Sequence, residues 1–298
     1  MNGAPAREWT AIAWQGGVED AAIVVVDRRA RPPGSQTRSL VTLAAVLAAI
    51  QSGTVAGVGN LAIAAAYAVP LHVFVKARGR RCSNERLEDL VVEACARLSD
   101  ALPGVLPAQR SLTRLRECFD RHVGKLTALE VGARLLMEAR RFHREAGELG
   151  QRIAQLGLQA LPQSGTVLVV GACGALAYPT PGTGLAILQA GRHEGRDLAL
   201  AVLAGSDGGT TAVEWGEVAS WDLVTVARAL KRKDLAAVLL AADRVTAAGD
   251  LITPMGSYAV AALAKAHGIP VLAAAPYTCF DFSSDHAEDG PGHDAVPA

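Results

Sequence analysis

The second half of the chain alternates apolar runs typical of buried strands with segments whose apolar residues have helical spacing. The strand-like runs are TVLVVG (166–171), LALAVLAG (198–205), AAVLLAAD (236–243) and PVLAAAP (270–276). This alternation predicts βαβ units and a parallel sheet, in which ligands bind beyond the carboxyl ends of the strands. Those ends read GACG, GSDGG, AADR and APYT, so the polar residues of this half gather where a ligand is expected.

The first half has mainly helical spacing of its apolar residues. One strand-like segment, IVVVDRR (23–29), is followed by the turn-prone RPPGS. Helices are predicted in SLVTLAAVLAAIQSG, which stops at Gly53, in AGVGNLAIAAAYAV and in 85–102. The stretch 126–161 keeps an apolar stripe, which predicts one long helix or two helices with a break near Gly147. The chain is therefore expected to be an α/β protein with a mainly helical first part and a parallel-sheet second part.

Composition excludes several classes of partner. The 298 residues include 29 Lys+Arg and 29 Asp+Glu, so no net charge attracts nucleic acid, and 4% aromatic residues argue against a stacking platform. The five cysteines form no CxxC pair and no histidine lies at metal-ligand spacing, so we expect reduced thiols and no metal. The fragment GTGLAI lacks the third glycine of a dinucleotide fingerprint, so we expect no cofactor.

The sequence shows neither a targeting pattern nor a membrane-spanning pattern. The N-terminus has no apolar core of signal-peptide length, and the longest apolar run (61–75) contains Pro70 and is shorter than the ~20 residues of a membrane span. We therefore expect a cytoplasmic protein that binds neither membrane nor nucleic acid. The last segment, DFSSDHAEDGPGHDAVPA, is polar and contains Gly and Pro, which predicts a flexible tail.

Four stretches resemble the methylthioribose-1-phosphate isomerase family, relatives of the regulatory subunits of translation initiation factor 2B. The most specific is AADRVTAAGDLITPMGSYAVAALAKAHGIPVLAAAPYTCFD (241–281). The others are VLVVGACGALAYPTPGTGLAILQAG, RLLMEARRFHREAGELGQRIAQLG and VAGVGNLAIAAAYAV. The resemblance implies a helical N-terminal domain (1–125), a connecting long helix (126–164) and a Rossmann-like domain (165–281), followed by the flexible tail (282–298). It also implies a homodimer and a small sugar-like substrate, since the family isomerises an aldose 1-phosphate to a ketose 1-phosphate.

The family uses a Cys and an Asp near C1 and C2 of its substrate. Asp243 matches this Asp and is a candidate acid/base, although a helix N-cap or a salt bridge with Arg244 would also explain it. The family's THCNxG reads VVGACG here, so Gly171 occupies the Cys position and Cys173 follows two residues later. Cys173 is a candidate catalytic thiol at a helix N-terminus, with a buried, inert cysteine as the alternative.

The phosphate-binding positions depart most from the family. The Arg of the family's VRGAP is Ala56 here, and its Asn and Lys after NGD are Thr253 and Pro254. A Gln is replaced by Glu214, and an Arg aligns with Gln109, next to Arg110. These replacements remove the clamp that the family uses for the phosphate. Each lost charge-assisted contact is worth roughly 1.5–3 kcal/mol of binding free energy. The residues expected to bind substrate are Gly57, Arg110, Gly174, Gly182, Thr183, Gly184, Glu214, Asp250 and Thr253.

Two functions remain open from these residues. One is an isomerase with a divergent substrate, in which Cys173 or Glu214 assists Asp243 and the loop Gly182–Gly184 orients the ligand. Tight loop packing explains those glycines equally well. The other is a non-catalytic module that binds a metabolite or a protein, which the displaced cysteine and the altered clamp favour. An unmodified methylthioribose-1-phosphate isomerase would need phosphate ligands that the sequence does not identify.

Overall fold

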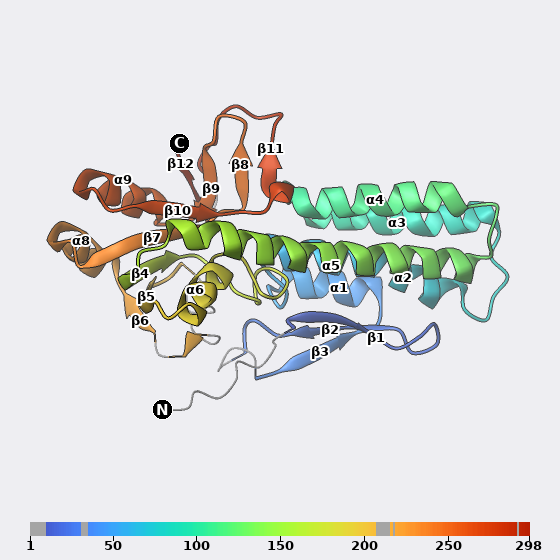
Figure 1. Ribbon diagram of the computed structural model, residues 1–298. Helices are drawn as coiled ribbons and strands as arrows, with labels where there is room; N and C mark the ends of the chain where they lie inside the picture. The colour runs from blue at the N-terminus through green and yellow to red at the C-terminus, as the bar shows by residue number, and fades with distance from the viewer. Residues whose placement is uncertain (1–9, 31–34, 207–214, 217, 291) are drawn as a thin grey trace. The chain divides into compact units, whose positions relative to one another are not determined.

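The computed structural model describes residues 10–30, 35–206, 215–216, 218–290 and 292–298 (Figure 1). The chain divides into two compact units, and among the described residues one comprises 10–146 and the other 147–298. The division falls inside the long helix α5 (Ala128–Ala160), which runs without interruption through Gly147. Of the two arrangements predicted for this stretch, the single long helix is the one observed.

The N-terminal unit combines a small sheet with helices. An antiparallel sheet has the order β1-β2-β3, made of Ile12–Gln15, Ala22–Val26 and Thr37–Leu40. The helices are α1 (Leu43–Gln51), α2 (Val58–Ala77), α3 (Asn84–Ala101) and α4 (Leu106–His122), together with the first part of α5. Sequence patterns missed β1 and β3, because four half-exposed residues carry too little periodicity to identify a strand. They also missed α4, although its buried residues, from Ala108 to Phe119, recur at helical spacing.

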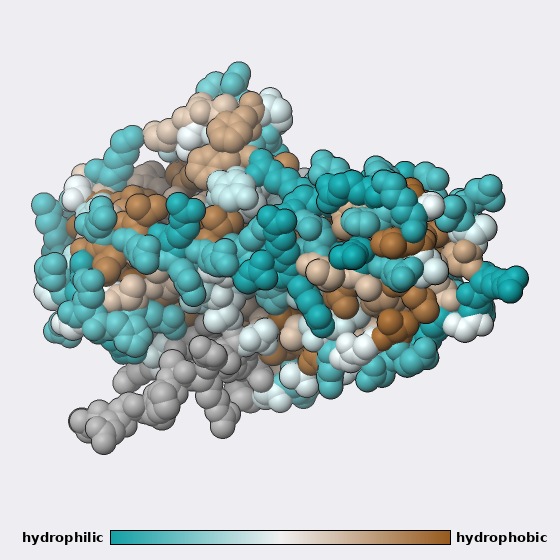
Figure 2. Space-filling model, turned by 45° about the vertical axis from the view of Figure 1, so that its right-hand side comes forward, coloured by the Kyte–Doolittle hydropathy of each residue, from teal (hydrophilic) through white to brown (hydrophobic). Residues whose placement is uncertain are grey.

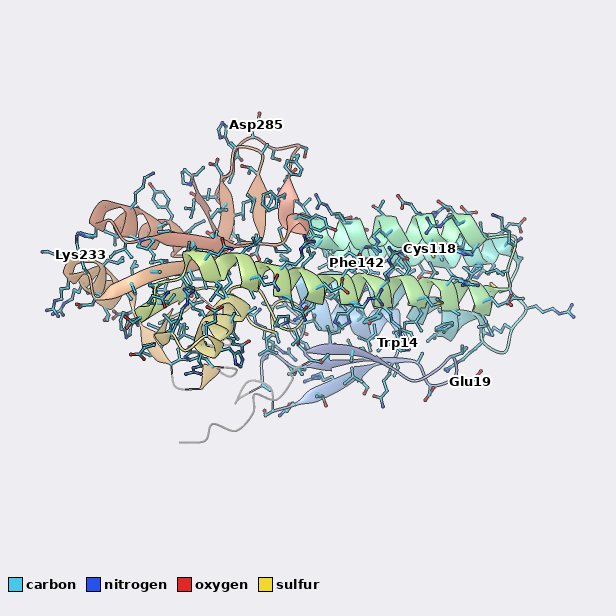
Figure 3. The ribbon with its side chains drawn as sticks, in the orientation of Figure 1. Trp14, Glu19, Cys118, Phe142, Lys233 and Asp285 are labelled. Atoms are coloured by element: carbon cyan, nitrogen blue, oxygen red, sulfur yellow. The ribbon has the colours of Figure 1, made fainter. Side chains whose placement is uncertain are left out.

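Helix α2 is the core helix of this unit. It extends eight residues beyond the predicted end at Val69 and contains Pro70 in its interior. Proline removes one backbone hydrogen bond, and burial of the surrounding apolar residues offsets that loss. By length and composition α2 could cross a membrane, but 83% of its apolar window is buried inside the protein, as in the core helix of a soluble protein. Trp14 packs on it through Tyr67, at a ring-centroid distance of 5.8 Å (Figure 3).

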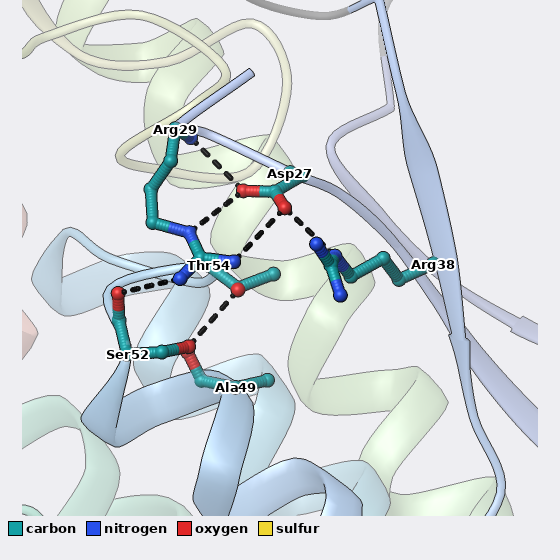
Figure 4. A network of polar contacts seen from close by, with 6 residues as sticks. All are labelled: Asp27, Arg29, Arg38, Ala49, Ser52 and Thr54. Carbon is teal, nitrogen blue, oxygen red and sulfur yellow. Dashed lines mark hydrogen bonds and ion pairs between the residues drawn. The ribbon is translucent and has the colours of Figure 1, made fainter.

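A buried carboxylate ties this sheet to the end of α1 (Figure 4). Asp27 is 3% exposed and accepts hydrogen bonds from Arg29 Nε at 3.1 Å and from Arg38 Nε at 2.7 Å. Arg29 also donates to the backbone oxygen of Ser52, which caps the C-terminus of α1. The hydrogen bonds from Arg29, ahead of those from Arg38, hold the pKa of Asp27 well below its usual range, although burial opposes the shift.

The C-terminal unit contains the predicted parallel sheet. Its order is β10-β7-β4-β5-β6, and each neighbouring pair is parallel. The strands are β4 (Ser164–Val170), β5 (Asp197–Leu203), β6 (Ala219–Trp221), β7 (Leu235–Ala241) and β10 (Val271–Ala274). The helices are α6 (Gly184–His193), α8 (Leu223–Arg232) and α9 (Ser257–His267). Strands β4 and β7 have almost fully buried centres, which explains why they appear in the sequence as continuous apolar runs.

A second sheet projects from this unit at the top of Figure 1, and apolar side chains gather over it in Figure 2. Its order is β11-β8-β9-β12, made of Phe280–Asp281, Arg244–Thr246, Leu251–Pro254 and His293–Val296. A short 3₁₀ helix, η1 (Tyr277–Cys279), precedes β11. The ring of Phe280 on β11 lies 6.0 Å from that of Phe282 in the turn after β11, and Phe282 is exposed.

The prediction of a flexible tail at 282–298 is wrong, because this segment supplies β12. Strand β12 pairs with β9 in antiparallel register from His293 opposite Pro254 to Val296 opposite Leu251. In addition, Asp294 Oδ2 accepts the backbone N–H groups of Gly256 at 2.8 Å and Tyr258 at 3.0 Å, at the start of α9. Polar composition suggested disorder, whereas these polar groups find backbone partners that cannot be read from the sequence.

Candidate functional site

The carboxyl ends of the central strands are joined by polar and close packing contacts. Ser206, just after β5, accepts a hydrogen bond from the backbone N–H of Gly171, just after β4, at 3.1 Å, and donates to the oxygen of Leu203 at 2.8 Å. Gly171 in turn packs against the end of β7, since a Cβ placed on it would lie 2.9 Å from Ala241 Cβ. The ends of β4, β5 and β7 therefore form one edge, as the parallel arrangement predicted.

Asp243 follows β7 at this edge and its side chain is 31% exposed. Its backbone N–H donates to the oxygen of Ile252 on β9 at 2.9 Å. Its carboxylate Oδ2 lies 3.2 Å from Nε2 of His293 on β12. Arg244, the alternative ion-pair partner, has its Nη1 3.5 Å from Oδ2 of Asp281. The Asp243 carboxylate is therefore part-exposed, and its side-chain partner, His293, lies on β12.

Cys173 has a different environment. It is 1% exposed and belongs to the apolar cluster between the sheet and α6. Its sulfur lies against Gly184, where an added Cβ would approach Sγ to 3.1 Å. Its backbone oxygen accepts the N–H groups of Thr183 at 3.0 Å and Leu185 at 3.2 Å. A substrate would reach this thiol only if the loop before α6 moved away, so a catalytic role for Cys173 stays a prediction.

The loop Gly182–Gly184 packs tightly against the loop after β4. A Cβ on Gly182, whose φ is 88°, would lie 2.8 Å from the oxygen of Cys173 and 3.0 Å from Cα of Gly174. Gly174 in turn starts a turn, accepting the N–H groups of Ala177 at 3.0 Å and Tyr178 at 3.1 Å. Close backbone approach therefore accounts for the glycines, and Thr183 is buried at 6% exposure. Substrate binding by this loop remains a prediction.

Asp250 and Thr253 both contact the C-terminal segment. Asp250 accepts the backbone N–H groups of Ala298 at 3.1 Å and Ala287 at 3.2 Å, and its Oδ2 lies 3.3 Å from His286 Nδ1. These bonds, the one from Ala298 first, lower the pKa of the Asp250 carboxyl. Thr253 is fully buried and its hydroxyl donates to the oxygen of Asp294 at 3.2 Å. In this conformation both side chains hold the end of the chain.

The remaining predicted residues lie elsewhere. Gly57 precedes α2 with a φ of 80°, and half-buried Arg110 lies on α4, both in the N-terminal unit. The side-chain amide of neighbouring Gln109 donates to Leu102 O at 3.2 Å, and its side-chain oxygen accepts from the Ser99 hydroxyl at 2.9 Å. Glu214 lies outside the described residues. The described part of the chain brings together no group of three or more His, Cys, Asp or Glu side chains that could hold a metal ion.

His293 and Ser206 were not identified as site residues from the sequence. His293 lies 50 positions from Asp243 and, like the other histidines, at no metal-ligand spacing, so no sequence motif points to it. The segment HDAV has two polar residues followed by two apolar ones, a pattern that indicates neither a strand nor the partner of that strand. Ser206 follows an apolar run directly, and such strand ends were already expected to carry the polar chemistry.

Comparisons with known proteins agree with this architecture. A family model described as the initiation factor 2 subunit family matches residues 217–292. The methylthioribose-1-phosphate isomerase of Carboxydothermus hydrogenoformans is 30% identical over 291 residues, which cover 94% of this chain and 82% of that protein. The alignment with the Heliobacterium modesticaldum protein of the same name is 29% identical and covers 65% of this chain but only 58% of the relative.

Solved structures show the same fold. A 5-methylthioribose 1-phosphate isomerase from Pyrococcus horikoshii superposes with a TM-score of 0.84 at 20% identity, covering 98% of this chain and 89% of that one. The delta subunit of a translation initiation factor eIF-2B from A. fulgidus superposes with a TM-score of 0.79 at 19% identity, covering 97% and 91%. At these identities the likeness concerns the fold, which enzymes and initiation-factor subunits share.

Proposed function

Because the chain belongs to the family of methylthioribose-1-phosphate isomerases and initiation factor 2B subunits, we propose that it is an isomerase of an aldose 1-phosphate or a related sugar derivative. The observation that carries the proposal is Asp243, a part-exposed carboxylate at the carboxyl end of β7 whose Oδ2 is bonded to His293. Relatives named as isomerases align over most of the chain, which supports the same reaction class.

The reaction needs only proton transfers. Removal of the C2 proton and cleavage of the bond from C1 to the ring oxygen, which takes up a proton, give an enol phosphate. Return of a proton to C1 and loss of the C2 hydroxyl proton then form the ketone. Two protons leave and two are taken up, and no oxidant or reductant is consumed. Asp243 is assigned the proton transfer at C2, because a part-exposed carboxylate can both accept and return a proton.

The substrate is proposed to differ from that of the housekeeping enzymes. Ala56, Thr253 and Pro254 stand where the family pattern has Arg, Asn and Lys, so the groups that hold its phosphate are missing. Thr253 is moreover buried and bonded to Asp294. We therefore expect a differently anchored phosphate or a sugar without one, as in a paralogue recruited to specialised metabolism. The expected homodimer also stays a proposal, which analytical ultracentrifugation tests directly.

The test is proton NMR of the purified protein with methylthioribose 1-phosphate and a panel of other aldose 1-phosphates, following the C1 and C2 protons. Wild type should convert at least one of them, and Asp243→Asn should lose the activity. Asp234→Asn is the matched control, because Asp234 is exposed and lies at the opposite, amino end of β7. Absence of turnover with every sugar phosphate, or full turnover by Asp243→Asn, contradicts the proposal.

The role of Cys173 is decided in the same assay. If Cys173 assists proton transfer, Cys173→Ser lowers turnover strongly while the protein keeps its thermal stability. If it is a packing residue, Cys173→Ser lowers the stability, because a hydroxyl replaces sulfur in an apolar cluster, and turnover per folded molecule is retained.

A second candidate function is a non-catalytic binding module. It is favoured by the burial of Cys173 at 1% exposure and by Gly171 at the family's Cys position, which leave no exposed thiol at this edge among the described residues. Calorimetric titration distinguishes the two functions. Saturable binding of a sugar phosphate without any change in its C1 and C2 proton signals would support the binding module.

A further inference from the structure

We propose that His293 is a positioning residue that orients the Asp243 carboxylate for proton transfer. The inference rests on the proposed function, because it assigns a role at the same site. It adds a residue from the end of the chain that the family resemblance did not point to.

Both members of the pair are fixed to the same strand. The backbone N–H of Asp243 donates to Ile252 O at 2.9 Å, and Ile252 belongs to β9. His293 lies on β12, opposite Pro254 of β9. The distance of 3.2 Å between His293 Nε2 and Asp243 Oδ2 is therefore set by one rigid strand rather than by two independent loops. Such preorganisation is what a proton-transfer site requires.

The hydrogen bond leaves one carboxylate oxygen available. Oδ2 of Asp243 is held by the imidazole, and no residue in the part of the chain that the structure describes bonds Oδ1. A carboxylate that is 31% exposed would otherwise rotate about its last side-chain bond. The bond from Nε2 fixes that rotation and presents Oδ1 in one orientation, much as a third group orients the base in other catalytic constellations.

The other carboxylates near β12 are engaged by backbone groups. Asp294 accepts from Gly256 and Tyr258, and Asp289 accepts from Ala295 at 2.8 Å. Alternation along a strand also directs the side chains of His293 and Asp294 to opposite faces of the sheet. Among the residues that the structure describes, Asp243 is the carboxylate recorded in contact with the His293 imidazole.

Anchoring of β12 does not require this pair. Four residues of β12 are in register with β9, the Asp294 carboxylate holds the start of α9, and Thr253 donates to Asp294 O. A contact between two side chains that are 43% and 31% exposed adds little to stability. A contact that adds little to the stability of the fold but fixes the candidate acid/base is explained by positioning.

The test compares His293→Gln with His293→Leu under saturating substrate in the NMR assay. Glutamine places an amide N–H near the position of Nε2 and should keep kcat within about threefold of wild type, whereas leucine removes the donor. His293→Leu should lower kcat by about 100-fold with KM changed less than about twofold, because orientation of the reacting group is lost rather than substrate binding. His193→Leu, at an exposed position near the end of α6, is the control and should match wild type.

The outcomes separate this inference from the proposed function. If wild type turns over substrate and His293→Leu retains its kcat, or if both variants lose activity equally, positioning is wrong while the isomerase proposal stands. If wild type has no turnover, both fall. Nitrogen-15 NMR provides a readout independent of activity: the imidazole signals of His293 should change in Asp243→Asn, and unchanged signals would show that the contact is absent in solution and overturn the inference.

Discussion

A Cβ atom on Gly171 would lie 2.7 Å from Cγ of Pro254, closer than side-chain carbons approach one another in folded proteins. The family resemblance predicts that Gly171 stands at the position of the family's cysteine and Pro254 at that of its lysine. The two departures from the family therefore contact each other. The proline ring occupies the space that a side chain at position 171 would use, so the packing at these two positions is coupled.

This contact predicts a large cost for a side chain at position 171. Gly171→Ala should lower the free energy of unfolding by about 2–4 kcal/mol, from strain at positive φ and from overpacking against Pro254. Gly205→Ala is the control, because Gly205 has a similar φ of 82° but no atom of a described residue beyond its chain neighbours within 4 Å of an added Cβ. Gly205→Ala should lower the free energy of unfolding only through strain at positive φ, by about 1 kcal/mol.

Urea unfolding of the double variant Gly171→Ala with Pro254→Ala tests the coupling. Because Pro254→Ala removes most of the proline ring, the double variant should lose at least about 0.5 kcal/mol less free energy of unfolding than the two single variants lose together. Strict additivity of the two single changes would mean that the proline is not what excludes a side chain from position 171.

Burial predicts that Cys173 is protected from thiol reagents. In the folded protein a maleimide should modify partly exposed Cys82 rapidly, whereas Cys173, at 1% exposure, should react only through opening or unfolding. Peptide mass spectrometry after timed labelling measures both rates in one sample. Labelling of Cys173 as fast as Cys82 would show that the loop Gly182–Gly184 opens readily, and would favour the catalytic role of the thiol over the packing role.

Asp27 predicts a pH-dependent contribution to stability. The pKa of its carboxyl is lowered in the folded state by Arg29 and Arg38, so the folded state binds this proton less readily than the unfolded chain. Its stabilisation is present above the unfolded value of about 3.9 and is lost as the pH falls towards the folded pKa.

Replacement of Asp27 by asparagine measures that contribution. Asp27→Asn should cost about 1–3 kcal/mol at pH 7, because two arginines lose a buried charged acceptor, and the deficit should shrink below pH 4. Asp120→Asn removes an exposed partner of Arg116 and should cost at most about 0.5 kcal/mol. Urea titrations at pH 7 and pH 3 compare the variants. An equal deficit for Asp27→Asn at both pH values would contradict the assignment.

The end of α8 offers a stabilising substitution. Lys233 caps this helix in the left-handed conformation, with a φ of 61°, and is the one non-glycine residue with positive φ among those described (Figure 3). Lys233→Gly should raise the free energy of unfolding by about 1 kcal/mol, because glycine adopts this conformation without steric cost. Arg228→Gly, at an exposed position inside the same helix, should lower it by a similar amount. Thermal unfolding measures both, and a lower Tm for Lys233→Gly would contradict the prediction.

The local pattern of apolar residues was enough to predict the positions of the elements that have long or continuous apolar runs. The parallel strands β4, β5, β7 and β10 lie within about two residues of their predicted positions, and the long helix α5 was also expected. Such elements are predictable because burial on both faces of a sheet, or along one stripe of a helix, leaves its period directly in the residue types. The same reasoning placed Asp243 and Ser206 at strand ends.

Only the tertiary structure decided which of these residues meet. The distance from Asp243 to His293, the closure of Gly171 by Pro254 and the burial of Cys173 all join segments far apart in the chain. Strands as short as β8 and β12 carry little periodicity, and the partner of a polar side chain depends on which backbone groups the packed chain leaves unpaired. The sequence by itself therefore determined the fold class and the edge where polar groups collect. The packing of the chain decided that the segment expected to be free is instead a strand whose histidine holds the candidate acid/base.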